Sequence, residues 1–170
     1  FVNRTDDGVT GSYVQAEPGS FALDIMPMWS QTDGQIHFWR IVPQGNSEFL
    51  TAIYSVDPNE GEAVEVRDLS EVMAGQLPIY DISNISMDGM SALSPDGTKV
   101  AAALTEVVNF GVTSNGLWVI DVADVEAEPQ MLMTNEDFQA AYPSWQNLPG
   151  VPQGLSWTGD SGAVVVNTFS

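Results

Sequence analysis

Three short segments decide the fold of this chain: PMWSQTDGQI (Pro27–Ile36), ALSPDGTKV (Ala92–Val100) and SWTGDSGAV (Ser156–Val164). Each segment has an apolar anchor residue, then Ser or Thr, then an Asp and a Gly, and finally a β-branched residue. The anchors Trp29, Leu93 and Trp157 are evenly spaced, since 93 − 29 and 157 − 93 are both 64. Repetition at a fixed period is the sequence signature of a repeat architecture. The sequence therefore predicts a tandem repeat with a period of 64.

A second block of sequence keeps the same period. IYSVD (Ile53–Asp57) is followed at the same interval by LWVID (Leu117–Asp121), because 117 − 53 is again 64. Beyond this block the spacing grows to 66, where Val66 corresponds to Leu132, and it returns to 64 at Trp157. We therefore expect a two-residue insertion and a compensating deletion in loops of the second unit. The expected units are residues 27–90, 91–154 and an incomplete 155–170, with residues 1–26 as the tail of a preceding unit.

Each complete unit is predicted to form four antiparallel strands. The first strand ends at the Asp-Gly turn, because Asp and Gly tolerate the backbone angles of tight turns. The apolar runs that follow are nearly continuous, which is typical of sheets that are covered on both faces. The anchors are therefore expected to be buried at equivalent positions. The other expected strands are 36–42, 52–56 and 63–66 in the first unit, 100–104, 117–122 and 130–133 in the second, and 164–166 in the third.

The expected connections between strands differ in length. Asp68–Gly75 has an Asp cap and a Gly stop, and Thr134–Pro143 has a Thr cap and a Pro stop, so both are predicted as short helices. Pro43–Glu48 and Thr105–Gly116 are predicted as long loops between second and third strands. In an antiparallel unit alternate connections emerge at the same end, so these loops and helices are expected to share one end of the molecule.

The same end carries the candidate contact residues. Phe110 lies in a predicted loop, and three further aromatic residues lie in the segments that precede first strands. These side chains either cover the edges of the sheets or form a contact surface, since aromatic residues are enriched in protein interfaces. The tentative binding set is Asn46, Tyr80, Phe110, Tyr142 and Trp145.

The charge of the chain limits its partners. It has 23 acidic and 4 basic residues among 170, which gives a net charge of −19. Such a field repels nucleic acid and anionic membranes, and the few basic residues are scattered along the sequence. No apolar run approaches the roughly 20 residues of a membrane span. We therefore expect neither nucleic-acid binding nor membrane insertion, and the acidity favours a periplasmic, cell-surface or secreted location.

Catalytic and metal-binding patterns are weak. His37 is the only histidine, and because the sequence lacks a G-x-S-x-G elbow it is predicted to be packed or hydrogen-bonded in the structure. The chain has no cysteine. Asp33, Asp96 and Asp160 are accounted for by turn formation. The loop that begins with Asp57–Glu62 lacks the Gly at the sixth position and the Glu at the twelfth position of an EF-hand loop. We expect a non-enzymatic protein without catalytic residues, metal ligands or cofactors. A module stabilised by loosely bound calcium is an alternative.

One pair of motifs resembles a known family. LSPDG (Leu93–Gly97) together with LWVID (Leu117–Asp121) is similar to the repeats of TolB-type and WD-like β-propellers, and the other anchors are looser copies. The resemblance implies an all-β fold of four-stranded propeller blades and a scaffold or protein-binding role in the cell envelope or exterior. Related repeats also form the propeller halves of prolyl-oligopeptidase-like enzymes. An accessory propeller of a hydrolase, whose catalytic domain is absent from this chain, is therefore the other alternative.

The repeat length also predicts a partial propeller. Propellers close with about four to eight blades, and 170 residues hold fewer than three units of 64. The two ends of such a stack expose sheet faces and strand edges that need cover. Cover is expected from the remainder of a longer polypeptide, from a protein partner or from a copy of the same chain, and we favour the first.

Overall fold

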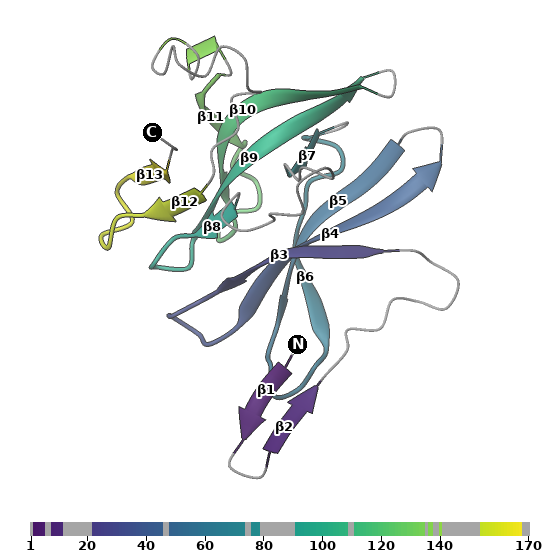
Figure 1. Cartoon of the computed structure of the whole chain (residues 1–170), viewed down its shortest axis with the longest axis vertical. Helices are drawn as coiled ribbons and strands as arrows, with labels where there is room; N and C mark the ends of the chain where they lie inside the picture. The colour runs from purple at the N-terminus through teal and green to yellow at the C-terminus, as the bar shows by residue number, and fades with distance from the viewer. Residues whose placement is uncertain are drawn as a thin grey trace.

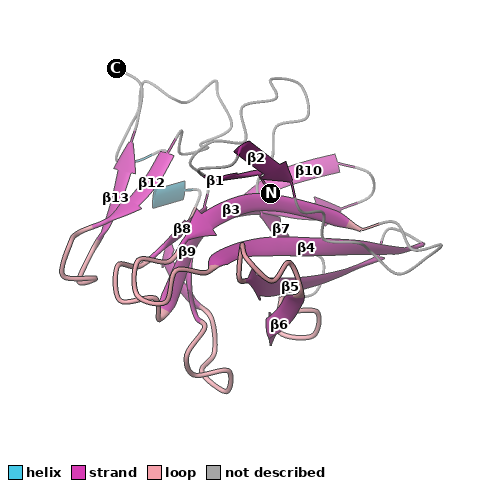
Figure 2. Cartoon of the chain, turned by 90° about the horizontal axis from the view of Figure 1, so that it is seen from below, coloured by secondary structure: helices cyan, strands magenta, loops and turns pink. Residues whose placement is uncertain are grey.

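The computed structural model describes residues 2–5, 8–11, 22–45, 48–73, 76–78, 91–108, 111–134, 136–137, 140 and 154–167. Antiparallel strands supply most of the regular structure in this part of the chain (Figures 1 and 2). The predicted all-β class is therefore confirmed.

The first sheet contains four antiparallel strands in sequence order. They are β3 (Leu23–Trp29), β4 (Ile36–Gly45), β5 (Glu48–Val56) and β6 (Ala63–Asp68). The β-branched and aromatic residues of β4 and β5 suit a pleated, covered surface. All four strands overlap the segments that the sequence predicts.

The second sheet has a divided first strand. Its strands are β7 (Gln76–Pro78), β8 (Ser91–Leu93), β9 (Lys99–Val108), β10 (Gly111–Asp121) and β11 (Gln130–Met133). Both β7 and β8 pair antiparallel with β9, at successive stretches of it. Leu23 pairs with Ile41 and Leu77 pairs with Thr105, so β7 takes the place of the first half of β3. Residues 79–90 intervene between the two halves.

Two hairpins complete the described structure. β12 (Gly154–Trp157) pairs with β13 (Val164–Asn167), as expected for the start of a third unit. β1 (Val2–Thr5) pairs with β2 (Gly8–Gly11), a hairpin that the sequence analysis did not anticipate.

Equivalent residue pairs recur at the predicted spacing. The cross-strand pairs at the turns are Trp29–Ile36, Leu93–Val100 and Trp157–Val164. Ile53 and Leu117 lie in the third strands, β5 and β10. Directly after each of them the pairing with the fourth strand shifts its register. Ile53 pairs with Arg67 and Leu117 pairs with Met133, so these two partners in the fourth strands are 66 residues apart, since 133 − 67 is 66.

The predicted long loops are wrong. β9 continues to Val108 and β10 begins at Gly111, with paired residues throughout most of Thr105–Gly116. Pro43–Glu48 is likewise mostly strand, with only residues 46–47 between β4 and β5. The Thr and Val residues of Thr105–Gly116 are enriched in strands, whereas the Gly and Asn of both segments are not, so composition alone does not separate strand from loop here.

The first predicted helix is also wrong in detail. Ser70–Met73 forms a turn in which the Met73 N–H donates to the Leu69 carbonyl at 2.9 Å, and Asp68 accepts from the Ser70 N–H at 2.8 Å. In the second segment Glu136, Asp137 and Ala140 are helical. There the Thr134 hydroxyl accepts from the Asp137 N–H at 3.1 Å, which is the predicted cap.

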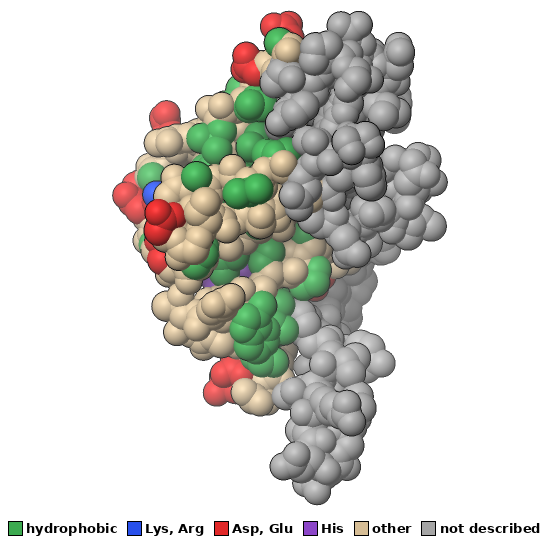
Figure 3. All heavy atoms as spheres, turned by 60° about the vertical axis from the view of Figure 1, so that its left-hand side comes forward, with side chains coloured by type: hydrophobic (Ala, Val, Ile, Leu, Met, Phe, Trp, Pro, Cys, Tyr) green, Lys and Arg blue, Asp and Glu red, His purple; other side chains and the backbone are tan. Residues whose placement is uncertain are grey.

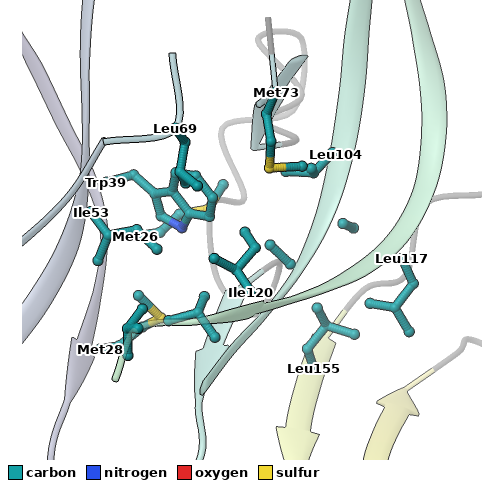
Figure 4. Packing of buried hydrophobic residues seen from close by; sticks show 14 residues of the cluster. Met26, Met28, Trp39, Ile53, Leu69, Met73, Leu104, Leu117, Ile120 and Leu155 are labelled. Carbon is teal, nitrogen blue, oxygen red and sulfur yellow. The ribbon is translucent and has the colours of Figure 1, made fainter. Parts of the chain in front are cut away.

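The first sheet, the second sheet and the β12–β13 hairpin, which we call the third sheet, share one hydrophobic core. Its side chains come from the first sheet, the turn after β6, the second sheet and β12, and they meet between the sheets (Figure 4). The first strands lie next to one another, with β8 in contact with both β3 and β12. We call the side of each sheet that looks towards the next sheet its front face, and the opposite side its rear face.

Polar contacts join neighbouring sheets. The Trp39 indole on the front of β4 donates to the Ser91 hydroxyl at 2.9 Å, and the Trp157 indole donates to the Ala92 carbonyl at 2.9 Å. Arg67 of β6 is buried, and its guanidinium donates to the carbonyls of Asp121 and Ala127 in the second sheet and the connection after it. These contacts fix the sheets relative to one another.

The prediction that all three anchors are buried is wrong for Trp29. Leu93 and Trp157 are half-buried, whereas the Trp29 side chain is 59% exposed. The three residues hold the same register position and lie on rear faces, because they alternate with front-face residues such as Met28. Leu93 faces the first sheet and Trp157 faces the second sheet. Trp29 lies on the face of the first sheet that points away from the second sheet.

Candidate protein-binding surfaces

Three turns lie in a row at one end of the stack, which we call the turn end. They follow β3, β8 and β12. The Thr32 hydroxyl donates to the Pro95 carbonyl at 3.1 Å, and the Asp96 N–H donates to the Ser161 hydroxyl at 3.1 Å. Each turn therefore contacts the next one.

The turns are held internally by their Asp side chains. Asp96 Oδ1 accepts from the Ser94 hydroxyl at 2.6 Å, and also from the Thr98 N–H and hydroxyl. The hydrogen bond from Ser94 is the main reason that the pKa of Asp96 falls to about 2. Asp160 accepts from the Thr158 hydroxyl at 2.6 Å in the same way, which lowers its pKa.

This geometry favours the turn-forming interpretation of the Asp residues over a metal site. One carboxylate oxygen of each side chain, Oδ1 of Asp96 and of Asp160, already accepts from hydroxyl and N–H groups of its own turn. In the described part of the chain, no three His, Cys, Asp or Glu side chains gather as metal ligands would.

The opposite end of the sheets, the loop end, carries the connections that the sequence analysis favours for binding. Because the strands are antiparallel, the connections after β4, β6, β9 and β11 emerge there. All five predicted contact residues lie outside the described residues. Asn46 and Phe110 fall in the short connections 46–47 and 109–110, Tyr80 falls in 79–90, and Tyr142 and Trp145 fall in 141–153. Their role at the loop end stays a prediction.

The rear face of the first sheet carries an aromatic and charged cluster that the sequence analysis missed. Arg40 binds Asp24 through two hydrogen bonds of 2.7 and 2.8 Å, which raises the pKa of Arg40. Its guanidinium lies over the Tyr54 ring, 4.4 Å from the centroid, and over Phe38 at 5.5 Å. The Tyr54 hydroxyl donates to Glu65 at 2.9 Å. We call these five residues the rear-face cluster.

The cluster has a weak sequence signal. Phe38 and Arg40 are two residues apart in β4, so they share a face, and Tyr54 is the cross-strand partner of Phe38. Burial, and secondly the bond to Glu65, raises the pKa of Tyr54. An alternation of aromatic and basic residues in a predicted strand is the pattern that could have indicated the cluster.

His37 is buried on the front face of β4, beside Met28 and Ser55 in register. This position confirms a packed histidine. Neither ring nitrogen has a hydrogen-bond partner among the described residues. Burial lowers the pKa of the imidazole, while the negative charge of Asp33 acts in the opposite direction.

Hydrophobic side chains also reach the surface. Those that are most exposed are Val64, Trp29, Val72, Val125 and Leu132. In Figure 3 hydrophobic groups lie among polar ones, with acidic groups towards the margin of the described face. In the described part of the chain, no helix is long and apolar enough to cross a membrane.

Comparisons of this chain with protein families, with curated proteins and with solved structures give no match.

Proposed function

We propose that the chain is part of a non-catalytic β-propeller that binds protein partners at its loop end, in the cell envelope or outside the cell. One observation carries the proposal: the cross-strand pair beside each Asp turn recurs in three sheets at one constant spacing along the chain. Recurrence of register, and not only of sequence, supports a tandem repeat of one supersecondary unit.

The placement of the first strands supports the propeller interpretation. In a propeller, four-stranded antiparallel sheets surround a central axis. Here β8 contacts β3 and β12, while the turns after these three strands are linked by hydrogen bonds. Neighbouring first strands with aligned turns are what a common axis on that side of the sheets requires.

A binding role fits the chemistry of the chain better than a reaction. The only histidine is buried between sheets and is not presented to a substrate. A rigid sheet scaffold that carries variable connections at one end is a frequent arrangement for binding sites. The net charge of −19 favours a protein partner with a basic surface over nucleic acid.

Site-specific photo-crosslinking tests the proposal. A photo-reactive amino acid replaces Phe110 at the loop end, and Gly159 at the turn end as the matched control. We expect one protein of the envelope or secreted fraction to be cross-linked repeatedly from the Phe110 position and not from the Gly159 position. The double variant Phe110→Ala with Trp145→Ala is expected to weaken binding of that protein while the far-ultraviolet circular dichroism stays unchanged.

A different footprint would overturn the assignment. If the same partner were captured only from the turn end, the binding surface would lie on the Asp turns. If purified chain with its two loop-end substitutions bound the partner as tightly as the unchanged chain, the aromatic residues would have no part in recognition.

A further inference from the structure

Each Asp turn begins with a Ser or a Thr, and in two of the three turns the hydroxyl of this residue is bonded within the turn. The Ser94 hydroxyl donates to Asp96 at 2.6 Å and accepts from the Lys99 N–H at 2.9 Å. The Thr158 hydroxyl makes the same two kinds of bond in the third turn. The hydroxyl at this position is thus satisfied in both turns.

The first turn is built differently, and its hydroxyl residue Ser30 has neither partner. Asp33 comes one position later in the repeat than Asp96, since 96 − 33 is 63 and not 64. Its Oδ1 accepts from the Gln35 N–H at 3.0 Å, which is the group that corresponds to the Lys99 N–H. Ser30 is 1% exposed, and its hydroxyl has no hydrogen-bond partner among the described residues. Because buried hydroxyls are normally paired, Ser30 requires another partner.

The imidazole of His37 is a second unpaired polar group on the same side of the sheet. Met28 is the cross-strand partner of His37, and Ser30 follows Met28 by two residues, so Ser30 and His37 share the front face. His37 is 6% exposed, and neither ring nitrogen has a partner in the described part of the chain. Ala101 and Val165 hold the same repeat position in the other two sheets. The need for a partner at this position therefore arises in the first sheet.

The Asp33 carboxylate is close enough to act on both unpaired groups. Burial lowers the pKa of His37, and the negative charge of Asp33 partly offsets this effect. Burial raises the pKa of Asp33 itself, but the Ser30 hydroxyl and the Gln35 N–H outweigh burial and bring it below 3.8. Ser30 and His37 make no direct hydrogen bond to each other or to Asp33. Three polar groups thus surround one position without bonding directly across it.

The second sheet leaves room beside the Ser30 hydroxyl. Gly97, in the turn between β8 and β9, faces Ser30 across the junction of the two sheets. A methyl group on its Cα would lie 3.5 Å from Ser30 Oγ and 3.4 Å from Thr32 Oγ1, and no atom beyond the residues adjoining Gly97 would be closer. A methyl group and a water molecule are similar in size. A volume of about one water molecule is therefore open next to the unpaired hydroxyl.

We propose that one water molecule is bound between the first and second sheets, where it bridges the side chains of Ser30, Asp33 and His37. The water accepts from the Ser30 hydroxyl, and it donates to the Asp33 carboxylate and to the ring nitrogen of His37 that carries no proton. A buried water makes about three hydrogen bonds, which these three groups supply. Calcium would need six to eight oxygen ligands, more than these side chains offer. One water does not replace bulk solvent, so the pKa of His37 stays lowered.

Oxygen-17 magnetic relaxation dispersion of the full chain tests the proposal, because it counts long-lived waters and is not affected by proton exchange. The double variant Ser30→Ala with His37→Leu removes two of the three partners. We expect this variant to hold one long-lived water fewer than the unchanged chain. Ser94→Ala is the matched control, since the Ser94 hydroxyl is satisfied within its own turn, and it should leave the number unchanged.

A double-mutant cycle gives a second measurement, from urea unfolding. Ser30→Ala and His37→Leu should each lower the equilibrium constant for folding. If a water links the two side chains, the double variant should lose less than the product of the single effects, by a factor of at least about five. The effects of Ser94→Ala and His37→Leu should multiply to within about two-fold. Circular dichroism of each variant shows whether it is folded.

Three results would contradict the proposal. The first is an equal number of long-lived waters in the unchanged chain and in the Ser30→Ala, His37→Leu variant. The second is a Ser30 and His37 pair whose effects multiply as those of the control pair do. The third is a change of the His37 ring proton resonances with equimolar Zn²⁺, which would assign the position to a metal ion. Substitution of Phe110 and Trp145 should change none of these readings, so this proposal and loop-end binding fail separately.

Discussion

His37 lies between the first and second sheets, on the face of β4 that looks towards β8. Burial removes water from its ring and so disfavours the protonated form. Asp33 partly offsets this effect through its negative charge, and the resulting pKa in the folded chain is below the ordinary value of 6.5. Protonation of His37 is therefore linked to the stability of the folded chain.

We expect the free energy of unfolding to fall as the pH decreases from above 6.5 towards the folded pKa of His37. In this window the unfolded chain binds more protons than the folded chain, so acid favours unfolding. Urea unfolding at a series of pH values measures the effect. His37→Gln should flatten the profile in this window, because His37 is the only histidine. An unchanged profile in that variant would assign the pH dependence to other groups.

The Asp turns act at the scale of single connections. Asp96 links Ser94 to Thr98 across the turn between β8 and β9, and Asp160 links Thr158 to Gly162 between β12 and β13. The side chain lies at the surface, so its contribution is limited by competition with water. The Asp96 side chain fixes the geometry of the turn between β8 and β9, and this turn also contacts the turn between β12 and β13.

Asp96→Ala is expected to lower the free energy of unfolding by about 1 kcal/mol, and Asp96→Asn by less because the amide oxygen still accepts. The folded pKa of about 2 is below the unfolded value of 3.8. The stabilisation by Asp96 is thus present above 3.8 and is lost as the pH falls towards 2. Chemical denaturation of these variants, with the exposed Glu128→Ala as control, measures both effects. Equal losses for Asp96→Ala and Glu128→Ala would exclude a special role of the turn.

The strands were predictable and many of their contacts were not. The even spacing of Trp29, Leu93 and Trp157 was enough to predict that each of them lies in a strand that ends at an Asp turn. The exposure of Trp29 was not predictable, because it depends on whether another sheet covers that face. Composition also failed for Gln76–Pro78, since a Pro argues against a strand although it is tolerated at a sheet edge.

The candidate sites were also predictable only in part. The turn-forming role of Asp96 could be predicted from the Ser-Pro-Asp-Gly sequence alone. The rear-face cluster lies within one sheet and depends on strand register, whereas the contacts of Arg67 with the Asp121 and Ala127 carbonyls join β6 to the second sheet and the connection after it. Such contacts follow from the packing of whole sheets, which local sequence does not encode.

At the scale of the whole molecule, the core does not divide at the boundaries between sheets. Trp39 and Ile53 of the first sheet belong to the same cluster as Ile120 and Leu117 of the second, and Leu155 of β12 joins them (Figure 4). Stabilising contacts of one sheet are therefore also contacts of its neighbour. Such coupling favours a single cooperative unfolding transition.

Ile53→Ala and Leu117→Ala are each expected to lower the free energy of unfolding by about 2–5 kcal/mol. Hydrogen exchange should show equal loss of protection in β4–β5 and β9–β10 for either variant, although each substitution lies in only one sheet. Val72→Ala, at a side chain that is 57% exposed, is the control and should change stability by less than about 0.5 kcal/mol. Loss confined to the substituted sheet would show that the sheets unfold independently.

The divided first strand of the second sheet has a consequence for protein engineering. β7 and β8 are each hydrogen-bonded to β9. The register of each half therefore does not depend on the length of the chain between them. The corresponding gap in β3 contains only Met26 and Pro27. The junction between β7 and β8 is therefore a natural acceptor for a grafted peptide, such as an epitope tag or a short reporter loop. A graft there would be inserted in the first strand of the second sheet. At this position β7 and β8 both pair with β9 although residues 79–90 lie between them in the sequence.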